Sequence, residues 1–159
     1  MPNIDKDDEA LFEVLGDRFI VATRALYRSS RRLRMQRDLY TVNGRELTLV
    51  QVDTLELLAT RSEWRMREIA EALDVDQSTA SRTLNPLVDL KLATRETDRD
   101  DRRNIVVTMT PLGRRTAEQI SERRMALMRS ELLLMPPSHR LLLTEMLEEY
   151  VAILYREDD

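Results

Sequence analysis

A cluster of small polar side chains occupies residues 77–82, inside the segment DQSTASRTLNPLVDL at residues 76–90. Hydroxyl, amide and guanidinium groups donate and accept hydrogen bonds, which is the chemistry needed to contact the edges of base pairs. The second half of the segment carries Leu84, Leu87 and Val88, an apolar edge that can dock on a core. A helix with such a polar first half suits a probe that enters the DNA major groove. The candidate reading residues are Gln77, Ser78, Thr79, Ser81 and Arg82.

The same pattern also fits an ordinary amphipathic helix with a solvated polar face, so the neighbouring segments have to decide. A helical pattern at residues 66–73 precedes it. Residues 74–76 then form a short turn in which Asp76 can cap the next helix. Two short helices joined in this way predict a helix-turn-helix. Pro86 lies inside the second helix and should bend it beyond the reading residues.

The apolar period changes from 3.6 to 2 after residue 92, which predicts strands at residues 93–97 and 104–109. Together they make a wing at residues 93–109, a β-hairpin whose tip DRDDRR is charged. Arginine at such a tip can enter the narrow minor groove, although a solvated hairpin with internal Asp–Arg pairs also fits. The candidate tip residues are Arg99, Arg102 and Arg103, with Asp98 and Asp101 to orient them. Candidate phosphate contacts at the preceding helix are Arg65 and Arg67.

The helical patterns that flank this region need partners of their own. Residues 7–36 follow a 3.6 period over a length that indicates packing against another chain. Residues 111–135 and 139–155 form two further helices, and the last is too apolar to leave one face in water. Asn43-Gly44 marks a turn after the first helix.

The composition predicts a helix-rich protein and limits the chemistry that the chain can perform. Of 159 residues, 42% are hydrophobic and 34% charged, with 3 Gly and 5 Pro. Cysteine is absent and His139 is the sole histidine, so we expect no disulfide, metal or cofactor. No nucleophile–base pair or phosphate-cradling loop is present, so we expect no enzyme. Short apolar runs and an acidic beginning lead us to expect a cytoplasmic protein without a membrane partner.

The net charge of −4 is unevenly distributed along the chain. Residues 61–124 hold 13 Lys+Arg against 12 Asp+Glu, whereas the remaining residues hold 12 against 17. The middle of the chain can therefore present a local basic surface, although the total charge argues against indiscriminate polyanion binding. The acidic total keeps an alternative open: a winged-helix protein-interaction module without sequence-specific DNA binding.

In this order, the motifs resemble those of the MarR family of winged helix-turn-helix transcription regulators. The matching pieces are LTLVQ (47–51), REIAEALDVDQSTASRTLNPLVDLKL (67–92), DRDDRR (98–103) and VVTMTPLG (106–113). Thr48 and Gln51 in the first piece match a capping box. Where the family often has glycine, this chain has Asp74 in the turn and Lys91 after the second helix, which would cost stability in a left-handed backbone. The absence of cysteine excludes the thiol-based, peroxide-sensing branch of the family.

The resemblance implies a mainly α fold with a small β-hairpin wing, assembled as a homodimer. Residues 1–40 and 111–159 would supply the dimerisation helices, and residues 47–113 the DNA-binding domain. We expect a repressor that binds a pseudo-palindromic operator on double-stranded DNA. Many family members respond to small aromatic or anionic effectors held between the dimerisation helices and the DNA-binding domain. Candidate effector-binding residues here are Tyr27, Arg28, Arg32, Tyr40 and Trp64.

Overall fold

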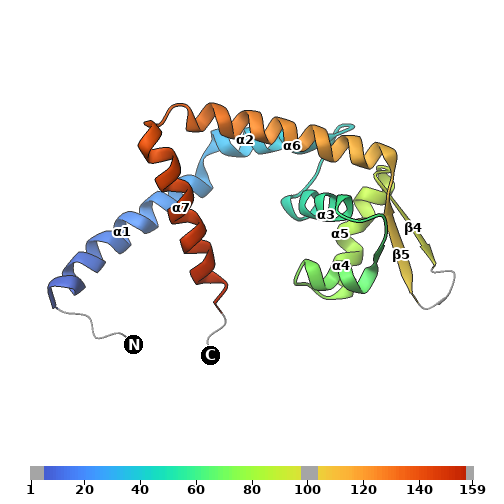
Figure 1. Cartoon of the computed structure of the whole chain (residues 1–159), viewed down its shortest axis with the longest axis horizontal. Coiled ribbons are helices and arrows are strands. Elements are labelled where there is room, and N and C mark those ends of the chain that lie inside the picture. Colours follow the sequence, from blue (N-terminus) through green and yellow to red (C-terminus); the bar gives the residue numbers. More distant parts are fainter. Residues whose placement is uncertain (1–5, 98–103, 157–159) are drawn as a thin grey trace.

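The computed structural model describes residues 6–97 and 104–156, which are mostly helical with two small antiparallel sheets. In chain order the elements are α1 (Lys6–Arg28), α2 (Ser30–Tyr40), β1 (Thr41–Val42), β2 (Arg45–Glu46), α3 (Leu49–Ala59), β3 (Trp64–Arg65), α4 (Met66–Ala72), α5 (Gln77–Asp89), β4 (Ala93–Thr97), β5 (Ile105–Met109), α6 (Pro111–Leu132) and α7 (Pro137–Leu154). We call α3, α4, α5 and the strands β3, β4 and β5 the winged unit. It lies at one end of the molecule, α1 and α7 lie at the other, and α6 connects the two ends (Figure 1). This architecture confirms the mainly α fold with a small β-hairpin.

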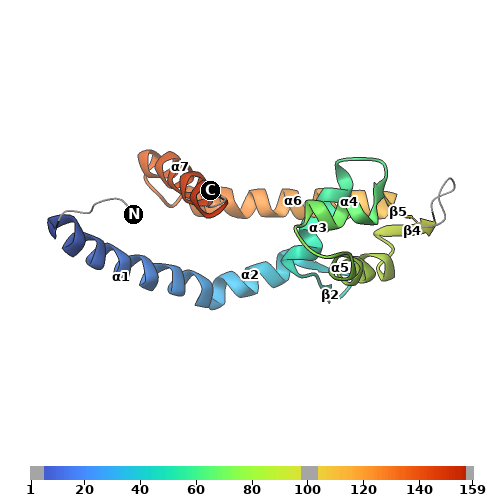
Figure 2. The same ribbon diagram turned by 90° about the horizontal axis from the view of Figure 1, so that it is seen from below.

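Ser29 separates α1 from α2, where the sequence pattern predicted one helix over residues 7–36. Serine side chains compete for backbone hydrogen bonds, and paired small residues are a common position for a helix break. Ser29 and Ser30 form such a pair. The helical path resumes directly, because the Leu33 nitrogen donates to the Ser29 carbonyl at 3.0 Å. The second helix then extends to Tyr40 and runs alongside part of α6 (Figure 2).

The turn predicted at Asn43-Gly44 is the tip of a two-stranded hairpin. Asn43 and Gly44 have φ angles of 51° and 80°, the pair of left-handed residues that a two-residue hairpin turn needs. The strands pair Thr41 with Glu46 and Val42 with Arg45. Strands of two residues are too short to show an alternating pattern, which is why the sequence indicated a turn here and no strand.

The capping box predicted at the start of α3 is present. The Gln51 nitrogen donates to Oγ1 of Thr48 at 3.3 Å, and the Thr48 nitrogen donates to Oε1 of Gln51 at 3.0 Å. These reciprocal bonds satisfy two backbone donors that the first turn of a helix leaves free. Beyond the cap, Val52, Leu55 and Leu58 are fully buried, so α3 forms the centre of the winged unit.

Asp74 and Lys91, where the resemblance leads us to expect glycine, both adopt the left-handed conformation. Asp74 has φ 51° and Lys91 has φ 59°, and each follows the last turn of a helix. The next residue closes that turn: Val75 donates to the Ala70 carbonyl at 3.0 Å and Leu92 to the Leu87 carbonyl at 2.8 Å. This pattern is the Schellman motif, in which glycine is favoured because it has no Cβ. Aspartate tolerates the position better than lysine, so the strain is greater at Lys91.

The predicted wing strands pair as expected and gain a third strand. β4 and β5 are antiparallel from the pair Ala93–Met109 to the pair Thr97–Ile105. On its other edge β5 pairs with β3, where Trp64 lies opposite Val107. The sequence does not predict β3, because a strand of two residues carries no periodic signal.

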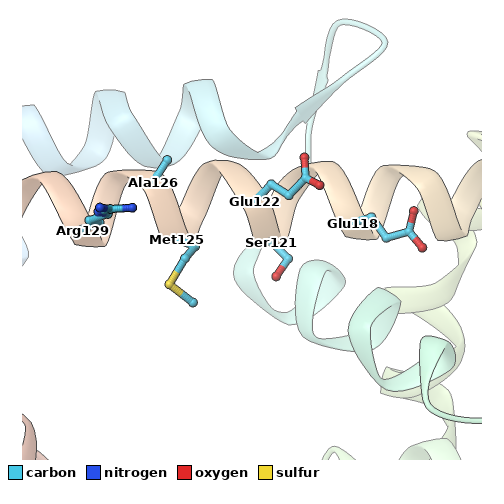
Figure 3. A pocket seen from close by; sticks show the side chains of 6 residues that line it. All are labelled: Glu118, Ser121, Glu122, Met125, Ala126 and Arg129. Atoms are coloured by element: carbon cyan, nitrogen blue, oxygen red, sulfur yellow. The ribbon is translucent and has the colours of Figure 1, made fainter.

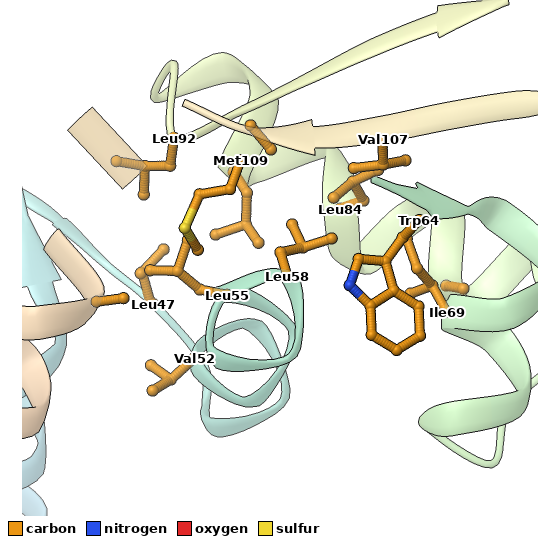
Figure 4. Close-up of a cluster of buried hydrophobic side chains, with 14 of the residues drawn as sticks. Leu47, Val52, Leu55, Leu58, Trp64, Ile69, Leu84, Leu92, Val107 and Met109 are labelled. Atoms are coloured by element: carbon orange, nitrogen blue, oxygen red, sulfur yellow. The ribbon is translucent and has the colours of Figure 1, made fainter. Parts of the chain in front are cut away.

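Large apolar side chains from α3, α5 and the sheet form one continuous core in the winged unit (Figure 4). The side chains of Leu55, Leu84 and Val107 have no exposed surface. The apolar side chains of α5 therefore anchor it to the core, and their burial contributes most of the free energy that fixes its orientation. The labelled members of this core are Leu47, Val52, Leu55, Leu58, Trp64, Ile69, Leu84, Leu92, Val107 and Met109.

The rest of the chain covers α7 very little, as it does the described residues of α1. None of the residues of α7 is buried, although this helix is rich in leucine, and Leu142 and Leu147 are each about half exposed. Phe19 and Tyr150 make an edge-to-face contact with ring centroids 5.3 Å apart, which joins α7 to α1. In the described ranges, no helix combines the length and apolarity required to cross a bilayer.

Gly113 lets the first turn of α6 approach the backbone that follows α5. A Cβ added to Gly113 would lie 2.0 Å from the Leu92 carbonyl oxygen, a distance that no side-chain rotation can relieve. Thr110, which caps α6, fixes the same approach: its nitrogen donates to the Leu92 oxygen at 3.0 Å and its hydroxyl to the Lys91 oxygen at 2.7 Å. The start of α6 is therefore attached directly to the end of α5.

Replacing Gly113 by alanine should lower the free energy of unfolding by about 1–3 kcal/mol, because the methyl group forces the two backbones apart. Gly16→Ala is the matched control: its Cβ would meet nothing within 4 Å, and a helical Gly-to-Ala change should stabilise by about 0.5–1 kcal/mol. Urea unfolding followed by circular dichroism measures both. Equal effects of the two substitutions would contradict the close approach.

Candidate nucleic-acid interface

α5 carries its polar and apolar residues on opposite faces. Ala80, Leu84 and Leu87 are buried against the core, whereas Ser78 and Arg82 are exposed. The sequence suggested a polar first half and an apolar second half. The structure divides the helix by face along its whole length, because each residue advances about 100° around the axis. Ala80 in the first half is therefore buried.

The predicted reading residues lie on this exposed face and at its margins. Gln77, Ser78 and Arg82 are exposed, while Thr79 and Ser81 are half-buried. The backbone oxygen of Ser81 accepts a hydrogen bond from Nη2 of Arg95 at 3.3 Å, so this turn of α5 is also attached to the wing strand β4. The structure brings the five residues together on two turns of one helix. Their contact with DNA stays a prediction.

Asn85 is an exposed residue of the same face that the sequence interpretation missed. It lies seven residues after Ser78 and three after Arg82. Residues at such spacings share one side of a helix. This spacing is the signal that could have identified Asn85, but the division of α5 into halves assigned it to the anchoring part. An asparagine amide can bond adenine in a bidentate manner.

Asp76 caps α5 and also bonds two of the predicted reading residues. Its Oδ1 accepts from the Thr79 nitrogen at 2.9 Å and from the Ser78 hydroxyl at 2.5 Å, and its Oδ2 accepts from the Thr79 hydroxyl at 2.7 Å. The hydrogen bonds from Ser78 and then Thr79 hold the pKa of the Asp76 carboxyl well below its usual range. The carboxylate is therefore ionised at neutral pH.

Arg82 extends this network by one turn. Its Nη2 donates to the Ser78 hydroxyl oxygen at 3.1 Å and to the Thr79 hydroxyl oxygen at 3.5 Å, and its Nε donates to the Ser78 carbonyl at 3.3 Å. The guanidinium thus lies along the exposed surface of α5 and points back towards its N-terminus. Asp76, Ser78, Thr79 and Arg82 form a connected set, which we call the cap network.

The two candidate phosphate contacts lie exposed at the start of α4. The Nε of Arg67 donates to Oε1 of Glu71 at 2.7 Å, and this bond raises the pKa of the Arg67 guanidinium. The backbone nitrogen of Arg65 donates to Oε2 of Glu68 at 2.8 Å. Each arginine is therefore bonded to an acidic residue of α4, Arg67 through its side chain and Arg65 through its backbone nitrogen. Neither arginine is buried.

The predicted wing tip lies outside the described residues. This applies to Arg99, Arg102 and Arg103 and to the orienting residues Asp98 and Asp101, so their assignments stay predictions. The strands that lead to the tip are described, and β4 is attached to α5 through the bond from Arg95 to Ser81.

The four predicted effector-binding residues whose side chains the structure describes lie in two different settings. Tyr27 and Arg28 are exposed on α1, whereas Tyr40 and Trp64 are each only 6% exposed in the core. Trp64 thus acts as a hydrophobic anchor here. The side chain of Arg32 lies outside the described residues.

A hollow on α6 is lined by residues of that helix alone. Its labelled side chains, from Glu118 to Arg129, project from one side of the helix (Figure 3). None of the predicted effector residues lines it. Among residues 6–97 and 104–156, no group of three His, Cys, Asp or Glu side chains is placed to hold a metal ion.

Comparison with known families identifies the helix-turn-helix segment. Residues 46–104 match a family model described as MarR family. The matched segment contains α3, α4, α5 and β4, and therefore the turn and the cap network. No curated protein sequence matches the chain.

Solved structures share the fold over nearly their whole length. YusO from Bacillus subtilis has a TM-score of 0.67 at 20% identity, and the match covers 88% of this chain and 96% of that one. FabT from Streptococcus pneumoniae, solved in complex with DNA, has a TM-score of 0.68 at 13% identity, covering 90% and 96%. BpsR from Bordetella bronchiseptica, studied for regulation of DNA binding by 6-hydroxynicotinic acid, has a TM-score of 0.61 at 23% identity, covering 82% and 90%. At these identities the likeness establishes the common fold.

Proposed function

We propose that the protein is a sequence-specific DNA-binding regulator of transcription of the MarR family, whose model matches residues 46–104, and that it acts in the cytoplasm without catalysing a reaction. The observation that carries this proposal is the exposed polar face of α5, held on a buried apolar face beside a β-hairpin. Base edges in the major groove present donors and acceptors that such a face can contact. The DNA complex of FabT, which has the same fold, supports the proposal.

Each group of candidate residues has a distinct part in the proposed complex. Arg82 bonds guanine and Gln77 bonds adenine, since these side chains match the acceptors and donors of those bases. Ser78, Thr79 and Ser81 complete the set of α5 residues that face the groove. Phosphate contacts fix the orientation of the helix but carry no sequence information. The remaining groups are Arg65 and Arg67 at phosphates, and Arg99, Arg102 and Arg103 in the wing, oriented by Asp98 and Asp101.

Replacing Arg82 by alanine should weaken binding to a preferred duplex by about 1–3 kcal/mol, because one bidentate base contact is lost. The preferred duplex is selected from a randomised library, and affinity is measured by fluorescence anisotropy. Arg129→Ala, an equal change of charge at an exposed position of α6, is the matched control. If both variants bind as tightly as the parent, Arg82 does not read a base.

The salt dependence of the same titration separates DNA binding from the alternative of a protein-interaction module. Each neutralised phosphate should contribute about 0.9 to the slope of log affinity against log salt. A regulator that contacts several phosphates therefore loses affinity steeply as salt rises. A slope near zero would favour the protein-interaction module.

The exposed apolar surface of α1 and α7 supports a homodimer. Leucines of α7 are half exposed, and a soluble monomer rarely leaves such a continuous apolar surface in water. In the proposed dimer, residues 1–40 and 111–159 form the dimerisation part and residues 47–113 the DNA-binding part. Two-fold symmetry then places the two α5 helices about 34 Å apart, one turn of DNA, so the operator is pseudo-palindromic.

The protein should have a solution mass of about twice its 18.7 kDa chain mass by light scattering. Leu147→Glu should shift the mass towards that of the monomer, because it places a charge on the apolar face of α7. Leu49→Glu is the control, since Leu49 is 49% exposed, compared with 54% for Leu147, and lies on α3. A monomeric parent protein at micromolar concentration would overturn the dimer.

The proposed regulator is a repressor that a small aromatic or anionic effector releases from DNA. The regulation of BpsR by 6-hydroxynicotinic acid, in a protein with the same fold, supports this part of the proposal. Isothermal calorimetry with a panel of aromatic acids should find at least one compound that binds and lowers affinity for the preferred duplex. Absence of heat for every compound, with DNA affinity unchanged, would contradict effector control.

A further inference from the structure

We propose that Asp76 determines the hydrogen-bond polarity with which α5 meets base pairs, because the hydroxyls of Ser78 and Thr79 both donate to its carboxylate and can then only accept from a base. The inference rests on the proposed function, since it concerns which bases the DNA-binding face selects. Acceptors select base edges that donate. In the major groove these are the N6 amino group of adenine and the N4 amino group of cytosine.

The two carboxylate oxygens account for both hydroxyl protons. A hydroxyl has one proton to donate and two lone pairs that accept. The Ser78 hydroxyl donates to Oδ1 of Asp76 at 2.5 Å, and the Thr79 hydroxyl donates to Oδ2 at 2.7 Å. Without these bonds, either hydroxyl could rotate and donate to a base just as well as accept. The cap network removes that freedom before DNA arrives.

The ionised state of Asp76 makes this arrangement persistent. A carboxylate accepts shorter and stronger hydrogen bonds than a neutral group does, and it is favoured at the N-terminus of a helix. The bonds from Ser78 and Thr79 lower the pKa of Asp76, so the carboxylate stays an acceptor throughout the neutral range. The negative charge also disfavours the approach of phosphate oxygens, which leaves the neighbouring hydroxyls to the bases.

Arg82 occupies the position from which a donor can reach the free lone pairs of the Ser78 and Thr79 hydroxyls. Its Nη2 already donates to Oγ of Ser78 at 3.1 Å and lies 3.5 Å from Oγ1 of Thr79. When Arg82 extends to the O6 and N7 acceptors of guanine, it vacates these lone pairs. A base amino group can then take the place of the guanidinium. The cap network therefore favours a guanine next to an adenine or cytosine.

Asp76→Asn tests the inference while keeping the helix cap, because asparagine caps helices about as well as aspartate. Its amide replaces one carboxylate oxygen with an NH2 donor. The remaining oxygen keeps the bonds from the Thr79 nitrogen and the Ser78 hydroxyl, so the Thr79 hydroxyl loses its acceptor. At least one hydroxyl must then point its proton outwards. Bound sequences are selected from a randomised duplex library for the parent and the variant, and circular dichroism checks that both are folded.

The expected result is a change at one base position from adenine or cytosine towards guanine or thymine, by about three- to tenfold in relative affinity. Asp74→Asn is the matched control, because it removes the same charge two residues away at an exposed position. Asparagine also tolerates the left-handed backbone conformation of residue 74. This control should leave the selected sequence unchanged. Thr79→Val, which removes the hydroxyl and keeps the side-chain shape, should reduce discrimination at that same base position and provides a second test if Asp76→Asn does not fold.

The outcomes separate this inference from the proposed function. A folded parent protein that selects no sequence would overturn sequence-specific DNA binding itself. A selective parent whose Asp76→Asn variant selects the same sequence as Asp74→Asn would overturn only the role of Asp76. If Asp76→Asn changed the affinity for every duplex equally, the role of Asp76 in base selection would also be overturned, because only its charge would matter.

Discussion

The backbone of Leu92 connects the elements on which the proposed interface depends. Its nitrogen donates to the Leu87 carbonyl and closes α5, and its oxygen accepts from the Thr110 nitrogen that begins α6. Gly113 lies against the same oxygen, and β4 begins at the next residue. The end of α5, the start of β4 and the start of α6 therefore meet at one peptide. Backbone hydrogen bonds fix the relative orientation of these three elements, whereas side-chain packing alone would allow that orientation to vary.

The helix caps, which depend on residues three apart, could be predicted from the sequence. The capping box of Thr48 and Gln51, the cap at Asp76 and the start of α6 after Thr110 all depend on hydrogen bonds within one turn. The break at Ser29 and the strand at Trp64 were not predicted. The strand exists because β5 offers it a partner from a distant part of the sequence, and no local pattern contains that information.

The side chains of the candidate site could be predicted from the sequence, but the hydrogen bonds between them could not. Polar residue types located the reading face, yet the helical period that buries Ala80 and exposes Asn85 was not applied along all of α5. Aromatic residues near arginines suggested the walls of an effector pocket. In the fold, Tyr40 and Trp64 are buried, because a small winged unit gains more from covering large rings than from leaving them open. The wing-tip arginines lie outside the described residues.

The direct attachment of α6 to the end of α5 makes α6 a lever arm. Its 22 residues span about 33 Å at 1.5 Å per residue. A rotation of about 5° at the α7 end therefore displaces the α5 end by about 3 Å, the length of one hydrogen bond. In the proposed dimer, a small change in how the two copies pack their α1 and α7 helices would be enough to bring both α5 helices into or out of register with successive grooves of the DNA. The groove spacing of the DNA duplex would then determine which packing of the proposed dimer can bind.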